Sequence, residues 1–251
     1  MEQPGPAGIA AVVAAMQERL ETLTLAEESR RDFLATYQRT TGAVSRAVDR
    51  GVFEDPAWVE AWDVAFANLY LSAFDAERAG GDGVPRPWRL AFDAPAGLPP
   101  LRHVLLGVNA HINYDLPQAL LAVISVEQFA DEALLDRRRR DHEQIDGVLS
   151  DRVAAEDAEL ATRSARTLLD RALRPLNQQA SKRFLRESRR KVWHNTVELH
   201  KARVASPDDY RIRLAELELL SAARIADLLA PGQVLLRLAV AGFGVVLPPP
   251  A

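Results

Sequence analysis

Apolar side chains recur every three or four positions along most of the chain, which is the spacing of one face of an α-helix. In residues 9–23 this stripe consists of Ile9, Val12, Val13, Met16, Leu20 and Leu23. A second stripe runs through residues 25–48. The pair Asp55-Pro56 is typical of a helix start, because an acceptor side chain precedes a proline in the first turn. The helix predicted behind it, residues 57–77, carries an aromatic row made of Trp58, Trp62, Phe66, Tyr70 and Phe74.

The segment 79–100 breaks this periodicity. It contains prolines at positions 85, 87, 95, 99 and 100, which predicts a long loop. The apolar residues Trp88, Leu90 and Phe92 indicate that the loop is pinned to the body of the protein. A connection of this length in a globular protein is often functional, so we expect a lid or a pocket wall.

The rest of the chain is again helical in pattern. Helices are predicted at residues 101–129, 131–153, 154–173, 177–204 and 209–229. Pro117 is expected to kink or restart the first of these. The apolar segment 232–251 is interrupted by an arginine, two glycines and three prolines, so we expect it to pack on the body rather than cross a membrane. No strand pattern is visible, and the prediction is an all-α, single-domain bundle of about eight helices over residues 1–251.

The composition excludes several classes of protein. The chain has 251 residues, 48% hydrophobic and 26% charged, with a net charge of −4, which excludes a disordered chain and disfavours nucleic-acid binding. Cysteine is absent, so disulfides, thiolate metal sites and cysteine nucleophiles are excluded. The first 23 residues lack the basic start of a signal peptide, and we expect a cytoplasmic protein. The basic residues are almost all arginine, which is typical of GC-rich genomes such as those of actinobacteria.

The segment 107–117, Gly-Val-Asn-Ala-His-Ile-Asn-Tyr-Asp-Leu-Pro, is the most unusual of the chain. It places four polar residues in an otherwise apolar helix: Asn109, His111, Asn113 and Asp115. His111 and Asp115 are four positions apart and therefore share one helix face. Gly107 costs about 1 kcal/mol relative to alanine in a helix, which predicts a close approach by a neighbouring helix or a ligand. Buried polar groups need partners, so the row predicts a site for water, a metal or a substrate.

Two other predicted helices carry the same spacing, His142 with Asp146 and His194 with Glu198. Helical bundles assemble metal sites from imidazole and carboxylate groups on several helices, and such ligands suit Fe, Mn or Zn. The candidate ligands are His111, Asp115, Asp141, His194 and Glu198. The usual Glu-x-x-His spacing of di-metal bundles is missing, which weakens this hypothesis. No nucleotide-binding glycine motif is present, so no nucleotide cofactor is expected.

Each of these features also has a purely structural interpretation. A His–Asp pair at four-residue spacing can be a simple helix pair, and the aromatic row can be ordinary core. The run Arg137–Arg140 is typical of a solvated helix face, although it could instead face a diphosphate or an anionic lipid.

The segment 102–116 resembles the motif of an uncharacterised, mainly bacterial helical family that is frequent in actinobacteria. That motif reads roughly Gly-x-Asn-Ala-His-Ile-Asn-x-Asp-Leu. A second element would fall on Asp141, Ile145 and Asp146, where an aspartate replaces the usual asparagine, and a third would place an arginine before Trp193. The resemblance covers roughly residues 25–229. It implies an all-α fold, favours Asp141 together with the polar row over the remaining histidines, and assigns no activity.

Three functions remain open. The first is an enzyme that modifies a small, partly apolar molecule of bacterial specialised metabolism by cyclisation, elimination, hydrolysis or oxidation. Its acid–base or metal-binding residues would be His111, Asp115 and Asp141, and its substrate would contact Asn109, Asn113, Trp62, Tyr70 and Trp193. The second is a non-catalytic protein that binds a small apolar ligand. The third is a protein that handles diphosphates or anionic lipids. The sequence leaves a homo-oligomer open in each case.

Overall fold

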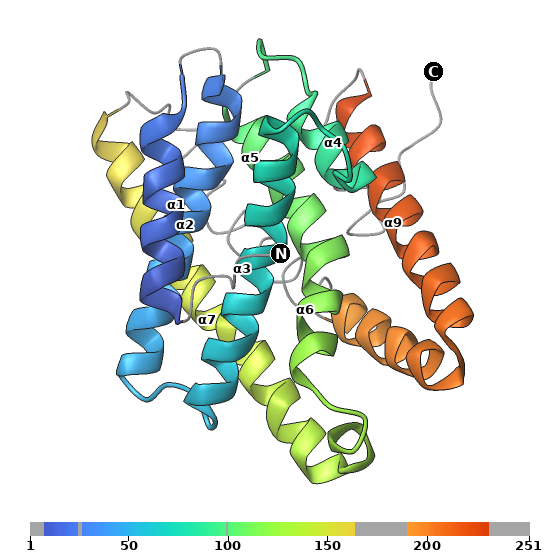
Figure 1. Ribbon diagram of the computed structural model, residues 1–251. Coiled ribbons are helices and arrows are strands. Elements are labelled where there is room, and N and C mark those ends of the chain that lie inside the picture. Colours follow the sequence, from blue (N-terminus) through green and yellow to red (C-terminus); the bar gives the residue numbers. More distant parts are fainter. Residues whose placement is uncertain (1–7, 25–26, 99, 164–189, 231–251) are drawn as a thin grey trace, which may run out of the picture.

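Three helices follow the first three apolar stripes and pack side by side: α1 (Ile9–Thr22), α2 (Glu28–Asp49) and α3 (Pro56–Arg78) (Figure 1). The computed structural model describes residues 8–24, 27–98, 100–163 and 190–230, and within these ranges all regular structure is helical. The predicted all-α, single-domain bundle is therefore confirmed.

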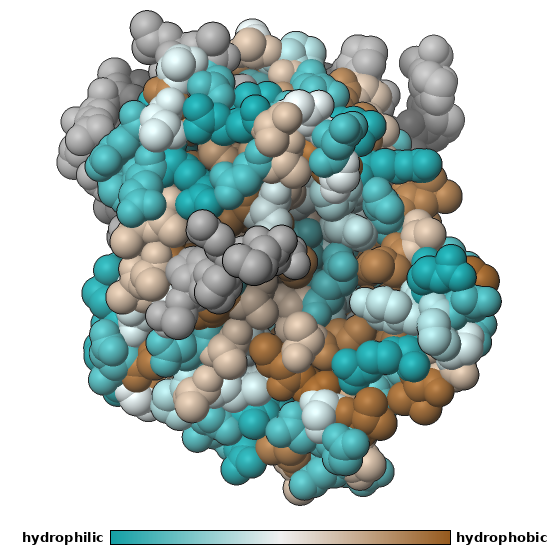
Figure 2. Space-filling view, viewed as in Figure 1, coloured by the Kyte–Doolittle hydropathy of each residue, from teal (hydrophilic) through white to brown (hydrophobic). Residues whose placement is uncertain are grey.

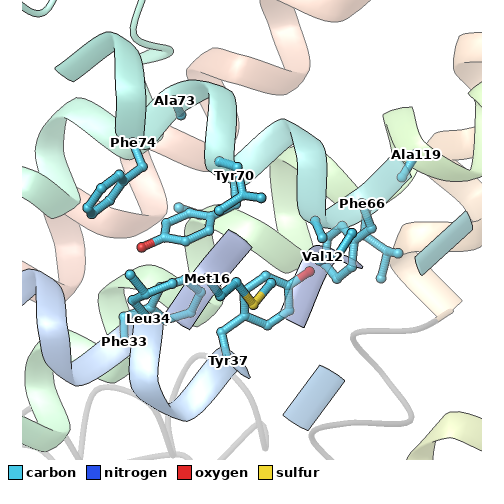
Figure 3. Close-up of a cluster of buried hydrophobic side chains, with 14 of the residues drawn as sticks. Val12, Met16, Phe33, Leu34, Tyr37, Phe66, Tyr70, Ala73, Phe74 and Ala119 are labelled. Atoms are coloured by element: carbon cyan, nitrogen blue, oxygen red, sulfur yellow. The ribbon is translucent and has the colours of Figure 1, made fainter. Parts of the chain in front are cut away.

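The start of α3 forms as the sequence predicts. The side chain of Asp55 accepts a hydrogen bond from the backbone N–H of Trp58 at 3.0 Å, and Pro56 occupies the first turn. The aromatic row of α3 points inward, and all five of its members are buried in the main core. The core interpretation of this row is thus confirmed for the described residues. Figure 3 shows how three of these rings meet apolar side chains of α1 and α2.

The proline-rich segment is not a plain loop. It contains the short helix α4 (Arg86–Phe92), in which Pro87 occupies the first turn. The prediction of a continuous loop over 79–100 was therefore wrong, because proline is compatible with the first turn of a helix. The expected aromatic pin is present, since the side chain of Trp88 is 1% exposed.

The helix predicted over 101–129 is divided into shorter pieces. These are α5 (Pro100–Ala110), a π-helical turn (His111–Asp115), α6 (Leu116–Val123) and a 3-10 turn (Gln128–Ala130). The restart expected at Pro117 is confirmed. The predicted C-terminal boundary at residue 129 was wrong, because the backbone is extended at Ile124 and α6 ends at Val123, six residues earlier.

In the C-terminal half, the observed helices differ from the predicted ones at the boundary expected near residue 153. One helix, α7 (Glu132–Arg163), replaces the two predicted over 131–153 and 154–173, because neither proline nor glycine separates them. Residues 190–205 are helical, and α9 (Pro207–Leu229) begins where Ser206 accepts a hydrogen bond from the backbone N–H of Asp209. The remainder of the predicted helices after 163 and the apolar segment 232–251 lie outside the described residues.

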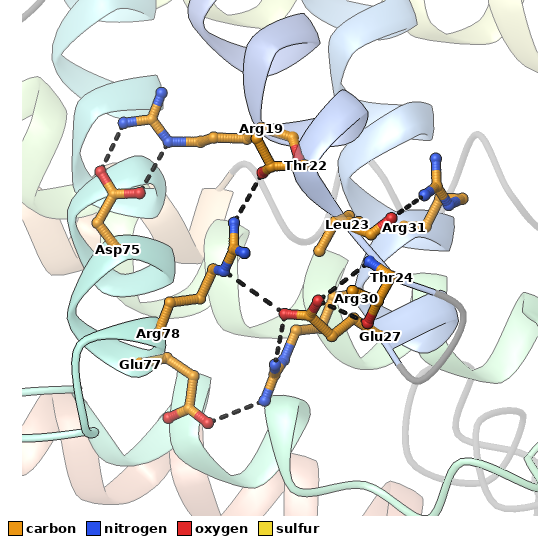
Figure 4. A network of polar contacts seen from close by, with 10 residues as sticks. All are labelled: Arg19, Thr22, Leu23, Thr24, Glu27, Arg30, Arg31, Asp75, Glu77 and Arg78. Carbon is orange, nitrogen blue, oxygen red and sulfur yellow. Dashed lines mark hydrogen bonds and ion pairs between the residues drawn. The ribbon is translucent and has the colours of Figure 1, made fainter.

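Arginine–carboxylate contacts tie the outer ends of α1, α2 and α3 together (Figure 4). Arg19 of α1 donates to Asp75 of α3 at 2.9 Å, and Arg30 of α2 donates to Glu77 of α3 at 2.9 Å. The side chains are partly exposed, so each pair contributes little to the free energy of unfolding on its own. Together the pairs link the three helices at these ends.

The face of the molecule in Figure 2 is mixed, with polar residues over most of it and smaller apolar areas between them. The large apolar side chains that are exposed include Ile212, Leu219 and Leu220 of α9. Among the described residues, no helix combines the length and the apolar character that a membrane crossing requires.

Candidate functional site

The π-helical turn contains the last three residues of the polar row and has a local cause. Pro117 has no backbone N–H for the carbonyl of Asn113, and its ring would clash with that carbonyl in a regular α-helix. The chain accommodates this by widening one turn, so that the N–H of Leu116 donates to the carbonyl of His111, five residues back. Turns of this kind occur frequently at functional sites.

His111 and Asp115 form a buried pair within this turn. Nδ1 of His111 lies 2.8 Å from Oδ2 of Asp115, and the same oxygen accepts a hydrogen bond of 2.8 Å from the indole N–H of Trp88. His111 is 3% exposed and Asp115 is 1% exposed. The predicted sharing of one face by the two residues is thus confirmed, and a third residue holds the carboxyl group in place.

Five aromatic rings surround the imidazole of His111. Phe66 stacks on it with 3.5 Å between ring centroids and 6° between ring planes. Tyr37 meets it edge to face at 4.5 Å. The other three centroids lie within 6.0 Å and belong to Phe33, Tyr70 and Trp88. We refer to these five residues as the aromatic cage.

The close approach predicted at Gly107 is made by Phe33, which forms one wall of this cage. A Cβ atom at this position would lie 2.4 Å from the ring of Phe33. Only glycine therefore lets α2 place this ring against α5. The neighbour is a side chain of another helix rather than a ligand.

Burial decides the charge of the pair. It lowers the pKa of His111 well below its ordinary value and raises the pKa of Asp115 well above its ordinary value, although the hydrogen bond from Trp88 opposes the latter shift. Both shifts favour the neutral form of the pair, and when the acid of Asp115 donates to Nδ1, Nε2 carries the imidazole proton. Nε2 is buried and makes no hydrogen bond to any residue that the structure describes.

This arrangement can transfer protons in both directions. The resting pair can donate the proton on Nε2 to a bound molecule. After the pair has lost one proton, Asp115 accepts from Nδ1–H, and the lone pair on Nε2 can act as a base.

The two asparagines of the row are held within their own helix. The amide group of Asn109 donates to the carbonyl of Leu105 at 2.8 Å, and that of Asn113 donates to the side-chain oxygen of Asn109 at 3.3 Å. Asn109 is buried and Asn113 is half-buried. Among the described residues, no hydrogen bond joins either asparagine side chain to the His111–Asp115 pair, which we refer to as the dyad.

Asp141 is placed elsewhere in the bundle. Its two carboxylate oxygens accept hydrogen bonds from the backbone N–H groups of Glu54 and Asp55, at 2.7 and 2.8 Å, just before α3 begins. The cage residue Phe66 follows Asp55 by eleven positions along the chain, which corresponds to roughly 16 Å of helix. The structure therefore does not bring Asp141 to the dyad but uses it to hold the chain entering α3.

The five candidate metal ligands do not come together either. His194 is exposed, and Glu198 contacts Lys201 at 2.8 Å and Arg213 at 4.0 Å. Among the described residues, no three His, Asp or Glu side chains are grouped in a way that could hold a metal ion. The structure brings together only His111 and Asp115 of the five predicted ligands, because Asp141, His194 and Glu198 lie on other helices, where Asp141 and Glu198 have other partners.

The aromatic residues predicted to contact a substrate lie in two different places. Tyr70 belongs to the aromatic cage, whereas Trp62 and Trp193 lie beside His142, with ring centroids 6.1 and 5.9 Å from it. Two surface pockets have volumes of about 450 and 280 Å³, and neither is lined by His111 or Asp115. Asp141 lines the larger one.

Three of the arginines in the run 137–140 are engaged with carboxylates. Arg138 pairs with Asp55 and lies over the ring of Trp58, while Arg139 pairs with Asp136 at 2.9 Å. Arg140 donates to Glu54 at 2.6 Å. These contacts fit the structural interpretation of the run better than an anion site.

Comparison with known protein families matches residues 9–231 to a family of unknown function (DUF5995). The chain belongs to this family. The expected membership of an uncharacterised helical family is therefore confirmed. No curated protein and no solved structure matches the chain, so no relative supplies an activity or a ligand for this DUF5995 member.

Sequence analysis missed several residues of this region. Phe33 and Tyr37 were read only as parts of an apolar stripe, and Asp63 and Thr41 were not considered. Asp63 carried a usable signal, because it lies three positions before Phe66 and seven before Tyr70, on the buried face of α3. A carboxyl group on such a face predicts either a partner or a shifted pKa.

Proposed function

We propose that the protein is an acid–base enzyme that acts on a small, mainly apolar molecule, with the His111–Asp115 pair as its proton-transfer group. The observation that carries the proposal is the state of the two imidazole nitrogens. Nδ1 is fixed by Asp115, which is fixed in turn by Trp88, while Nε2 is buried without a partner among the described residues. A base that is oriented by a carboxyl group and leaves its second nitrogen available is the common arrangement of acid–base sites.

The aromatic cage indicates the kind of substrate. Its rings offer apolar surface on several sides of the imidazole, which suits a flat or compact apolar molecule. Elimination and cyclisation both require a proton to be moved at such a molecule, and a tailoring step of bacterial specialised metabolism would provide one.

The proposal can be tested with 5-nitrobenzisoxazole, a small aromatic molecule that opens when a base removes its ring C–H proton. The proton moves to Nε2, the N–O bond breaks, and a coloured nitrophenolate is released. We expect the protein to accelerate this elimination and His111→Gln to lower the acceleration at least about 100-fold, the lower range for one acid–base group.

The exposed His194 provides the matched control, and His194→Gln should leave the rate unchanged. Because burial raises the pKa of Asp115, the basic form of the pair appears only as the pH rises, so the rate should increase with pH. Equal rates for the wild-type protein and His111→Gln would show that the pair is not the proton-transfer group.

The second candidate is a non-catalytic protein that holds a small apolar ligand. The observation in its favour is the aromatic cage itself, which would bind such a ligand whether or not a proton is transferred. The same variant separates the two functions. A binding protein would keep its affinity for toluene and show no His111-dependent elimination.

A further inference from the structure

Asp63 is a buried acid that the dyad does not use. It lies on α3, is 3% exposed, and its Oδ2 atom makes no hydrogen bond to any described residue. Burial raises the pKa of Asp63 to about 7. An unpartnered carboxyl group in the core is unfavourable for stability, so its retention points to a use in binding or chemistry.

Two hydroxyl groups of α2 belong to the face that meets this part of α3, where the rings of Tyr37 and Phe66 lie 6.0 Å apart, centroid to centroid. Tyr37 and Thr41 are four positions apart on one helix face, both are buried, and neither hydroxyl makes a hydrogen bond within the described residues. Burial raises the pKa of Tyr37 well above its ordinary value, the charge of Asp63 adds to the rise, and the nearby Thr41 hydroxyl opposes it. Geometry supports the same grouping, because Thr41 lies one helical turn from Tyr37, Asp63 lies one turn from Phe66, and the rings of Tyr37 and Phe66 pack against each other across the two helices.

This group of oxygens adjoins the dyad through Tyr37. The ring of Tyr37 meets the imidazole of His111 edge to face at 4.5 Å, and Phe66, one turn after Asp63, stacks on the same imidazole. Tyr70 is different, although its hydroxyl is also buried without a partner among the described residues. Figure 3 shows the hydroxyl groups of Tyr37 and Tyr70 at opposite ends of the aromatic cluster.

We propose that Tyr37, Thr41 and Asp63 form a subsite that binds the hydroxyl group of the substrate while the aromatic cage holds its apolar body. The inference rests on the proposed function and specifies its substrate class: a small apolar molecule that carries one neutral hydroxyl group. Such a group can donate to the carboxyl oxygen and accept from a protein hydroxyl, so it satisfies atoms that no described residue satisfies. A substrate with an anionic group at this position is disfavoured, because Asp63 would repel it.

Phenol and toluene test the subsite, because they differ by a hydroxyl and a methyl group on the same ring. We expect the wild-type protein to bind phenol at least about tenfold more tightly than toluene in titration calorimetry, the effect of one or two buried hydrogen bonds. The nearly isosteric changes Thr41→Val and Asp63→Leu should each reduce this preference severalfold. Both variants should fold, because each removes a buried polar group without a partner among the described residues. Thr40→Val is the matched control and should keep the preference, because Thr40 lies beside Thr41 in the chain but its hydroxyl donates to the carbonyl of Thr36 at 2.9 Å.

Equal affinity for the two probes, binding of neither, or a preference that survives both Thr41→Val and Asp63→Leu would overturn the subsite. Failure of the subsite is distinguishable from failure of the proposed function. If only the subsite is wrong, elimination of 5-nitrobenzisoxazole still depends on His111. If the proposed function is wrong, this dependence is absent even when phenol is preferred.

Discussion

The indole nitrogen of Trp88 donates a 2.8 Å hydrogen bond to the same carboxyl oxygen of Asp115 that faces His111. This bond connects α4, in the proline-rich segment, with the π-helical turn. The segment thereby acts as a wall of the candidate site. The hydrogen bond from Trp88 also lowers the pKa of Asp115, although burial raises this pKa by more.

Replacing Trp88 with phenylalanine should remove this bond while keeping most of the ring. We expect a loss of about 1–3 kcal/mol in the free energy of unfolding, measured by urea denaturation, because a buried acceptor loses its donor. The rise of elimination rate with pH should also move to higher pH. Trp62→Phe is the matched control, since the buried indole N–H of Trp62 has no partner among the described residues. Equal losses in the two variants would mean that the bond to Asp115 contributes nothing specific.

Gly107 and Gly147 offer a second matched comparison. Gly107→Ala places a Cβ atom 2.4 Å from the ring of Phe33, so α2 or α5 must shift, and we expect destabilisation of about 1–3 kcal/mol. At Gly147, in α7, the added atom has no neighbour within 4 Å among the described residues. Gly147→Ala should therefore stabilise the helix by up to about 1 kcal/mol. Thermal unfolding of both variants would reveal the difference, and a stabilised Gly107→Ala would contradict the packing described for the cage.

Asp63 makes stability depend on pH. Its pKa is about 7 in the folded protein, and an unfolded aspartate has an ordinary pKa near 3.9, so the folded state binds the proton more tightly. This contribution to stability is complete below about pH 4 and is lost as the pH rises through about 7. The free energy of unfolding of the wild-type protein, relative to Asp63→Asn, should therefore fall by roughly 4 kcal/mol between pH 4 and pH 8. Parallel curves for the two proteins would show that Asp63 is already ionised, or well hydrated, at low pH.

Asp141 should matter for stability rather than for proton transfer. Asp141→Ala leaves the backbone N–H groups of Glu54 and Asp55 without their acceptor, and we expect a loss of about 2–4 kcal/mol, or about 1–2 kcal/mol for each donor. Asp141→Asn retains one acceptor oxygen and should lose about half as much. Elimination by folded Asp141→Asn should equal that of the wild-type protein. A large fall in the rate without a fall in stability would return Asp141 to the active centre.

Local features were predictable where neighbouring residues alone determine them. Asp55 and Pro56 start α3, Ser206 and Pro207 start α9, and Pro117 interrupts the helix that carries the polar row, because each effect depends only on backbone donors and acceptors within one turn. The pairing of His111 with Asp115 was predictable for the same reason, since four-residue spacing brings the two side chains together.

The composition of the site was less predictable. Asp141 follows four arginines and His111 lies in an apolar helix, yet both side chains are buried, one against backbone amides before α3 and the other in the aromatic cage. The residues next to either one do not reveal these partners, because the partners come from other parts of the chain. The predicted metal ligands were likewise chosen by residue type, while the geometry that a metal requires depends on how the helices pack.

The sequence by itself therefore determined that this protein is a helical bundle, where most of its helices begin, and that His111 and Asp115 face the same side. Only the tertiary structure decided that five rings from α2, α3 and α4 enclose the imidazole, and that Tyr37, Thr41 and Asp63 are all buried where α2 packs on α3. The physical reason is the range of the interactions. Hydrogen bonds within a helical turn are fixed by local order in the chain, whereas contacts between helices follow from packing that many distant side chains determine together.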